Sequence, residues 1–315
     1  MDIPFELKVM SKHFFDSETR FASKMWIYLM WFHLQAISKA TSNGKASLEK
    51  IMNYISKHYT LRFDKPQHLE IFRTMDGEFE NKYSRLLSDS SNLTSEKAYK
   101  FIAELMSGTE GFQKLDYELR DQNLEQDALQ SQAEISYIES KVDFATVKTI
   151  LEVGAGYGRI SEYLLNSNQF NKYVIVDIPP ALWLSHFYLE QHYPNIKTSK
   201  FSATVTTEII MERLENFDII FISPSQLRYL SDNSIDLIIA INCLQEFPQS
   251  TINYYFSEFK RLSMYSYIKA QVSPHNIYQD DFMLFDDYLK GKYLEVLSKD
   301  QVVFPPNYMQ AVLIS

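Results

Sequence analysis

The chain has 315 residues, of which 45% are hydrophobic and 23% charged, a balance typical of a folded globular protein and not of a disordered or fibrous one. Its net charge of −9, from 31 basic and 40 acidic residues, argues against a surface for nucleic acid or for anionic lipid. A single cysteine, Cys243, excludes an internal disulfide.

The first residues predict a cytoplasmic protein. Asp2 and Glu6 stand where a signal peptide would carry positive charge before an apolar run. The most apolar stretch, 25–34, has ten residues, whereas a membrane span needs about 20. We therefore expect neither secretion nor a membrane partner.

Residues 1–140 are predicted to form an all-helical N-terminal domain that serves as a lid or a dimer contact. Apolar residues occupy nearly every face of 21–37, which predicts a helix buried in a core or in a homodimer interface. Ser47 can cap a second helix, and a third is expected over 94–106, ended by Gly108.

The polar segment 116–134 is predicted to be an exposed helix that links this domain to a second one, 141–315. In the second domain, β-rich runs alternate with helix-length segments, and the early runs are continuously apolar, as in parallel strands covered on both faces. The pattern predicts a doubly wound, Rossmann-like α/β fold with a mostly parallel seven-stranded sheet and an antiparallel C-terminal hairpin. The predicted strands are 149–153, 173–177, 217–222, 235–241, 265–272, 293–303 and 308–314.

Three of only 8 glycines lie between the first predicted strand and the helix that follows it, at Gly154, Gly156 and Gly158. Glycines at such a junction allow a tight turn and a close approach of the backbone to a ligand. The dinucleotide fingerprint reads G-x-G-x-x-G, but this chain reads G-x-G-x-G after Glu152, and Arg159 takes the place of the third glycine.

A carboxylate with the expected spacing accompanies the glycine cluster. Asp177 ends the second predicted strand, 19 residues after Gly158. An acid in this position can accept hydrogen bonds from ribose hydroxyls. Together the two features predict a cofactor that contains a ribose.

These motifs resemble those of the class I S-adenosylmethionine-dependent methyltransferases, whose E-x-G-x-G-x-G motif is matched by 152–158. The segments 150–158, 174–179 and 241–248 are similar to the sugar O-methyltransferases within that class. The resemblance covers about residues 145–275. The family usually has a glycine where Ala155 lies and a serine-like residue where Cys243 lies.

The resemblance implies S-adenosylmethionine as the cofactor. It implies that Glu152 holds the methionine amino group, Asp177 the ribose and Ile178 the adenine, and that Asn242 faces the methyl donor. The implied cofactor-binding residues are Glu152, Gly154, Ala155, Gly156, Tyr157, Gly158, Asp177, Ile178, Ser223, Pro224, Ser225, Gln226, Asn242 and Cys243.

Methyl transfer to a weakly acidic hydroxyl requires a general base. Glu246, just after the fourth predicted strand, is the first candidate, with Gln245 orienting the acceptor. The alternative for Glu246 is a favourable charge at the start of the next helix. His275 is the second candidate, and its alternative is a loop histidine without a role.

Other polar residues have both a functional and a structural interpretation. His275 with Asp280 and Asp281 could bind a divalent cation, but adjacent aspartates in a polar loop are more often solvated, so no metal is predicted. His186, among apolar neighbours, is interpreted as a packed core histidine. Cys243 has no evident histidine partner and is interpreted as a small packing residue rather than a nucleophile.

The favoured function is an O-methyltransferase for a sugar or glycosylated metabolite, with a small-molecule or glycan acceptor. Two alternatives stay open, a methyltransferase for a phenolic or polyketide hydroxyl and a non-catalytic S-adenosylmethionine-binding partner protein. A nicotinamide dehydrogenase has the wrong glycine spacing.

Overall fold

The computed structural model describes residues 2–22, 24–58, 124–167, 172–271, 285–289, 295–301 and 308–315. Several predictions fall outside them: the helix over 94–106 with Gly108, the candidate base His275, and the pair Asp280 and Asp281.

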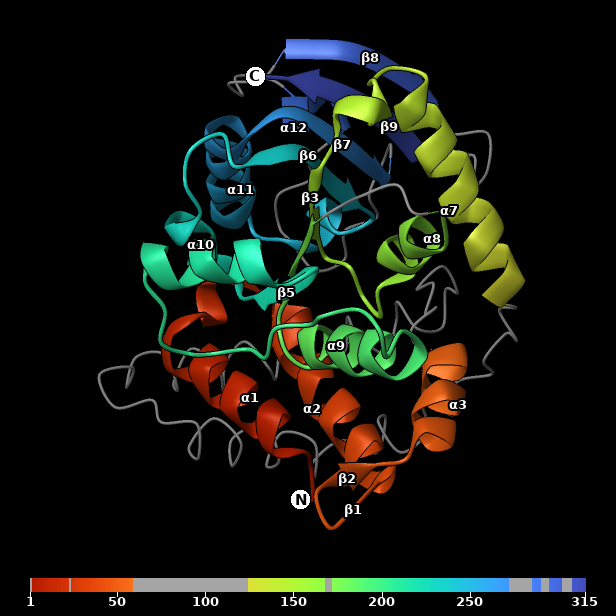
Figure 1. The fold of residues 1–315 in the computed structure, drawn as a ribbon, viewed down its shortest axis with the longest axis vertical. Helices are drawn as coiled ribbons and strands as arrows, with labels where there is room; N and C mark the ends of the chain where they lie inside the picture. Colours follow the sequence, from red (N-terminus) through yellow and green to blue (C-terminus); the bar gives the residue numbers. More distant parts are fainter. Residues whose placement is uncertain are drawn as a thin grey trace.

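A seven-stranded sheet forms the centre of the molecule, and it confirms the predicted α/β fold (Figure 1). The strand order is β5-β4-β3-β6-β7-β9-β8, in which the first five strands are parallel and β9 is antiparallel to both of its neighbours. The strands are β3 (Thr149–Val153), β4 (Lys172–Val176), β5 (Ile219–Ile222), β6 (Ile235–Ile241), β7 (Ser263–Gln271), β8 (Glu295–Gln301) and β9 (Tyr308–Ile314).

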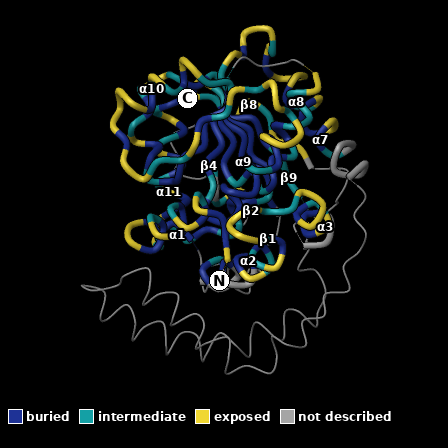
Figure 2. The backbone as a smooth tube through the Cα atoms, turned by 60° about the horizontal axis from the view of Figure 1, so that its bottom comes forward, coloured by how far each residue is buried: buried dark blue, intermediate teal, exposed yellow. Residues whose placement is uncertain are grey.

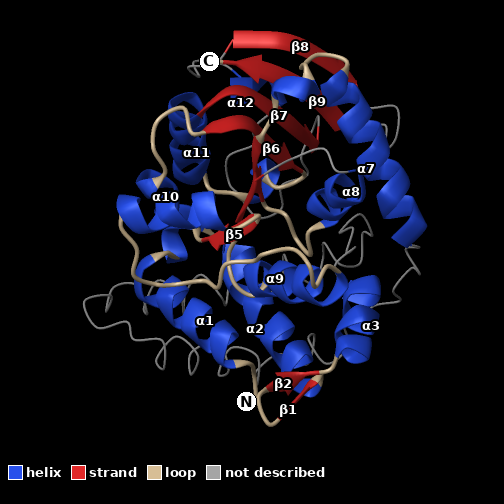
Figure 3. Cartoon of the chain, in the orientation of Figure 1, coloured by secondary structure: helices blue, strands red, loops and turns tan. Residues whose placement is uncertain are grey.

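Helices cover both faces of the sheet (Figure 3). Side chains of successive strand residues point to opposite faces, so Ile150 joins one apolar core and Leu151 the other. The first core contains side chains of α7 (Leu124–Glu139), α8 (Arg159–Ser167) and α9 (Ala181–His192); the second contains side chains of α10 (Thr207–Asn216), α11 (Gln249–Leu262) and α12 (Phe285–Leu289).

The N-terminal helices are α1 (Phe5–Ser17), α2 (Lys24–Lys39) and α3 (Leu48–His58), and each adds side chains to the first core. Figure 2 shows the buried strands at the centre, with these helices at one end of the molecule. Ser47 caps α3 as predicted, with its hydroxyl 3.5 Å from the Lys50 amide nitrogen. Short 3-10 turns complete the description: η1 (Thr19–Phe21), η3 (Phe144–Thr146), η4 (Pro224–Tyr229) and η5 (Leu244–Glu246).

One detail of the N-terminal prediction needs correction. The region is not all helical, because β1 (Thr41–Ser42) and β2 (Lys45–Ala46) form a hairpin. Its turn residues Asn43 and Gly44 have φ of 51° and 74°, a conformation that an Asn-Gly turn adopts readily. The predicted burial of 21–37 is satisfied within the chain for Met30, Leu34 and Ile37, so these side chains require no second subunit.

The linking helix was predicted to be exposed, and this is wrong for one side of α7. Ser131 and Glu134, within the predicted segment 116–134, are buried, because they share one face of α7 with Ile135 and Ile138 of the first core. The boundary near residue 140 stays a prediction.

Membrane insertion finds no support in the described helices, none of which combines the length and the apolar character needed to cross a bilayer.

Candidate functional site

The predicted site residues that the structure describes lie at the carboxyl ends of the parallel strands. Gly154 follows β3, Asp177 follows β4, Ser223 follows β5 and Asn242 follows β6. From β3 the chain proceeds to β4 on one side and later returns to β6 on the other. Open α/β sheets bind ligands at such a switch point, outside the strand ends.

The glycine loop adopts a conformation that other residues rarely adopt. Gly154, Gly156 and Gly158 have φ of 71°, 63° and 96°. A Cβ at Gly154 would lie 2.5 Å from the Cβ of Cys243, so this glycine lets the loop pass over the end of β6. A Cβ at Gly158 would lie 3.2 Å from Leu189, so Gly158 allows α8 to pack against α9.

Cys243 and the other loop residues lie close to the glycines. The Cys243 thiol is buried and donates to the Val153 carbonyl at 3.2 Å, and burial raises the pKa of this thiol, which agrees with a packing role. Ala155 and Tyr157 are buried, and both belong to the first apolar core.

Asp177 joins the tip of β4 to the glycine loop. One carboxylate oxygen accepts from the Ile178 amide at 2.7 Å, and the other accepts from the Gly156 amide at 3.1 Å. Burial raises the pKa of Asp177 to about 7 although both hydrogen bonds favour the charged form. The carboxylate is therefore held at the loop without a cationic partner among these contacts.

Glu152 lies beneath the glycine loop, in β3. It is buried, and its Oε2 accepts from the Tyr173 hydroxyl at 2.8 Å. Burial raises the pKa of Glu152 to about 7, and the charge of Asp177 acts in the same direction.

Glu246, the first candidate base, lies in η5 after β6. Its Oε2 accepts from the indole N–H of Trp26, in α2, at 2.6 Å. Burial raises the pKa of Glu246 to about 7, with a further contribution from Asp177, while the bond to Trp26 lowers it. Glu152, Asp177 and Glu246 are hereafter called the acidic cluster.

Asn242 and Gln245 complete this edge of the site. Asn242 has a left-handed φ of 56°, and its buried Oδ1 has no hydrogen-bond partner among the described residues. Gln245 donates from Nε2 to the Asn242 carbonyl at 3.0 Å. An orphaned buried amide oxygen at a strand tip fits a ligand that donates a hydrogen bond.

The acidic cluster predicts that stability falls with rising pH. The folded state holds the Glu246 proton above the unfolded pKa of 4.5, so its stabilising effect is full below pH 4.5 and is lost as the pH rises through about 7. Replacing Glu246 with glutamine, which keeps an acceptor for Trp26, removes this loss. Between about pH 5 and pH 8, E246Q should gain up to about 3 kcal/mol on the wild type in urea unfolding. Parallel pH curves for the two proteins would contradict the raised pKa.

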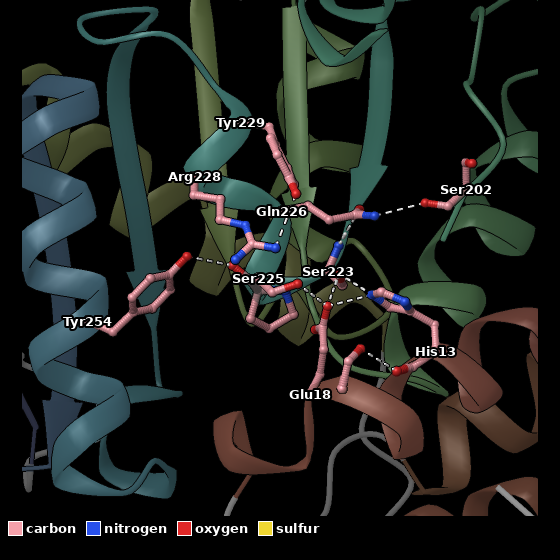
Figure 4. Close-up of polar contacts among 11 residues, drawn as sticks. His13, Glu18, Ser202, Ser223, Ser225, Gln226, Arg228, Tyr229 and Tyr254 are labelled. Atoms are coloured by element: carbon pink, nitrogen blue, oxygen red, sulfur yellow. Dashed lines mark hydrogen bonds and ion pairs between the residues drawn. The ribbon is translucent and has the colours of Figure 1, made fainter. Parts of the chain in front are cut away.

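The segment after β5 is held by the N-terminal helices (Figure 4). Glu18, fully buried after α1, accepts through Oε1 from the hydroxyls of Ser223 and Ser225 and contacts His13 Nε2 at 2.6 Å. Gln226 caps η4 and donates to the Ser202 carbonyl at 2.8 Å. The side chains of Ser223 and Gln226 are thus used within the protein, and their predicted place beside the adenine stays a prediction.

Ile178 also contacts the N-terminal helices. It is buried in a cluster with Phe14, Phe15, Ile27 and Met30. Elements α1 and α2 therefore lie against the ends of β4, β5 and β6, where the cofactor residues are predicted.

A buried ion-pair network adjoins the glycine loop, and sequence reasoning missed it. Glu134 of α7 lies 2.6 Å from Lys269 Nζ and 2.9 Å from an Arg159 guanidinium nitrogen. Arg159, which occupies the third-glycine place of the dinucleotide pattern, also donates to Ser131 at 2.7 Å. Spacing alone could have shown that residues 131–138 have a buried face, but not which charges meet there.

The remaining assignments concern His186 and a metal. His186 is buried with its ring centroid 4.6 Å from that of Phe221, and burial lowers its pKa, as expected for a packed core histidine. In the described part of the chain, no group of three or more His, Cys, Asp and Glu side chains could hold a metal ion.

No family model matches the chain, and no curated protein matches it. Similar solved structures include a candidate sarcosine dimethylglycine methyltransferase from Galdieria sulphuraria, with 17% identity and a TM-score of 0.41 over 54% of this chain and 63% of that one. This chain thus spans less than two thirds of that protein.

Two other similar structures are also methyltransferases. A SAM-dependent methyltransferase from Leishmania major has 13% identity and a TM-score of 0.42, covering 60% of this chain and 72% of its own. Another, from Aquifex aeolicus, has 13% identity and a TM-score of 0.37, covering 61% and 98%. Because the identities and TM-scores are this low, the proposed function rests on the residues of the site.

Proposed function

We propose that the chain is an S-adenosylmethionine-dependent O-methyltransferase whose acceptor is the hydroxyl of a sugar or glycosylated metabolite. The observation that carries the proposal is the acidic cluster around the glycine loop. Burial raises the pKa of each of its three carboxyls to about 7, although Arg159 acts to lower that of Glu152, so a cationic ligand bound beside these carboxyls would stabilise their charged forms.

The charge of the site distinguishes between the two cofactors considered. S-adenosylmethionine carries a sulfonium and an ammonium group against one carboxylate and is a net cation. A nicotinamide dinucleotide carries an anionic pyrophosphate, which the acidic cluster would repel. The glycine loop and the orphaned Oδ1 of Asn242 also fit a ligand that lies close to the backbone and donates hydrogen bonds.

Four residues of the site have proposed roles in cofactor binding and catalysis. When bound, S-adenosylmethionine supplies an electrophilic methyl group. Asp177 accepts from the ribose hydroxyls, and Glu152 holds the amino group through the loop or a water. Glu246 takes the proton of the acceptor hydroxyl, and Gln245 orients that acceptor.

The properties of Glu246 favour a hydroxyl acceptor. A general base works best when its pKa lies near the operating pH, and burial brings Glu246 to about 7. A carboxylate acceptor has no proton to lose and needs no base. A phenol is acidic enough to lose its proton more readily, whereas a sugar hydroxyl is so weakly acidic that its methylation depends on a base. A buried base therefore supports the sugar hydroxyl over the phenol as the acceptor.

The acceptor is tested with methyl-labelled S-adenosylmethionine and matched panels of sugars, glycosides and phenols. We expect labelled sugars or glycosides with the wild type and a rate reduced by about 100-fold or more in E246Q. Label on phenols alone would exclude the sugar acceptor. Binding without transfer to any acceptor would favour the non-catalytic alternative.

A pH-dependent preference for the charged cofactor is also expected. The acidic cluster becomes anionic as the pH rises through about 7, so affinity for the cationic S-adenosylmethionine should rise by about fivefold or more between pH 6 and pH 8. S-adenosylhomocysteine, which lacks the sulfonium charge, should gain less. Calorimetric titrations of both ligands at the two pH values measure this ratio, and an equal gain for both would contradict the proposed charge recognition.

A further inference from the structure

The candidate base is held by a residue from the opposite end of the sequence. The indole N–H of Trp26 donates to Oε2 of Glu246 at 2.6 Å, across a separation of 220 residues. Oε1 of the same carboxylate accepts no hydrogen bond from the residues that the structure describes. One oxygen is thus fixed, while the other is available to an acceptor hydroxyl.

Trp26 is itself held in position by side chains of the N-terminal helices. Its ring stacks on that of His33, with centroids 5.9 Å apart and an interplanar angle of 19°. His33 is buried and contacts the Tyr54 hydroxyl through Nδ1, and Tyr54 belongs to α3. A contiguous set of side chains therefore connects the N-terminal helices to Glu246.

The contact depends on the chemistry of the indole N–H. The N–H of tryptophan only donates, so it can bind the carboxylate form of Glu246 and offers no acceptor to its protonated form. The titratable groups that act on Glu246 from the strand ends are Asp177 and Cys243. Neither donates a hydrogen bond to it, and Trp26 alone among these three favours the anion.

Building on the proposed function, we infer that Trp26 is a positioning residue for the general base, so that α2 completes the active site. It fixes the carboxylate plane with Oε1 toward the acceptor, and its N–H favours the anionic form of Glu246 over the protonated form. The N-terminal helices then take part in the reaction and do more than cover the sheet.

The test compares Trp26→Phe, which keeps an aromatic ring and loses the N–H, with the wild type. We expect S-adenosylmethionine affinity within about threefold, turnover at pH 7 lower by roughly tenfold, and the acid limb of the rate–pH profile moved upward by about half to one pH unit. Trp183→Phe is the matched control, because Trp183 is buried in α9, stacks on Phe187 and donates no described hydrogen bond to Glu246. Its acid limb should stay in place.

A packing role for Trp26 would lower turnover equally at every pH, and an unmoved limb would overturn the inference. A second measurement does not depend on turnover. In ¹³C-glutamate NMR, with E246Q used to assign the signal, the Glu246 carboxyl should titrate at a higher pH in Trp26→Phe than in the wild type. A moved titration in a protein that transfers no methyl group would reject the proposed function and keep the contact; an unmoved titration would reject the inference.

Discussion

Replacing Gly154 with alanine is expected to abolish S-adenosylmethionine binding, with an affinity loss above about 100-fold, and to destabilise the fold by about 2–5 kcal/mol. The new Cβ would lie 2.5 Å from the Cβ of Cys243 and 3.1 Å from its Sγ, and φ of 71° adds backbone strain. The Cys243 Cβ is fixed to the backbone and cannot rotate away, so the loop itself must move. Calorimetric titration and urea unfolding measure the two effects.

Gly44→Ala provides the matched control. Gly44 has a similar φ of 74°, but no atom lies within 4 Å of the position that a Cβ would occupy. It should lose only about 1–2 kcal/mol from backbone strain and keep full cofactor affinity. If Gly154→Ala and Gly44→Ala bound the cofactor equally well, the close approach of the glycine loop to the end of β6 would not be required for cofactor binding. In the Gly154→Ala background, Cys243→Gly should recover part of the lost stability by removing the clashing Cβ.

The second large effect is expected from Glu134→Ala, which should lower the free energy of unfolding by about 3–5 kcal/mol. Glu134 lies between Lys269, of which 1% is exposed, and Arg159, and its removal would take away the carboxylate that both cations contact. Because Arg159 begins α8 directly after the glycine loop, cofactor affinity should fall as well, though less than in Gly154→Ala. Urea unfolding at pH 7 measures the loss of stability.

Two further variants show whether the lost carboxylate charge causes the drop in stability of Glu134→Ala. Glu215→Ala removes an exposed helical glutamate and should change stability by less than about 0.5 kcal/mol. Adding Lys269→Met to Glu134→Ala removes the buried ammonium and should restore a substantial part of the loss. A loss below about 1 kcal/mol in Glu134→Ala would show that the network contributes little.

Local patterns predicted the sheet and the position of the glycine loop well. Runs of apolar residues indicated all seven strands, and the positions of Gly154 and Asp177 relative to the strands placed them at adjacent strand ends, where the Gly156 amide contacts the Asp177 carboxylate. These features depend on residues that are neighbours in the sequence and on the general geometry of parallel sheets, so they can be predicted from local sequence patterns.

Contacts between distant segments could not be predicted in this way. Trp26 and Glu246 are 220 residues apart, and Glu18 and Ser223 are 205 apart. In each pair, the sequence around one residue does not specify which distant residue it will contact. Helical spacing of Leu7, Met10 and Phe14 does indicate an apolar face for α1, but not the strand ends against which that region packs.

The central claim is that the acidic cluster and glycine loop bind S-adenosylmethionine. The most direct test is calorimetric titration of the wild-type chain at about pH 8 with S-adenosylmethionine and, separately, with NADH. We predict saturable binding of one S-adenosylmethionine per chain, lost in Gly154→Ala and kept in Gly44→Ala, with no heat from NADH. Binding of NADH, or no binding of S-adenosylmethionine to the folded protein, would contradict the account.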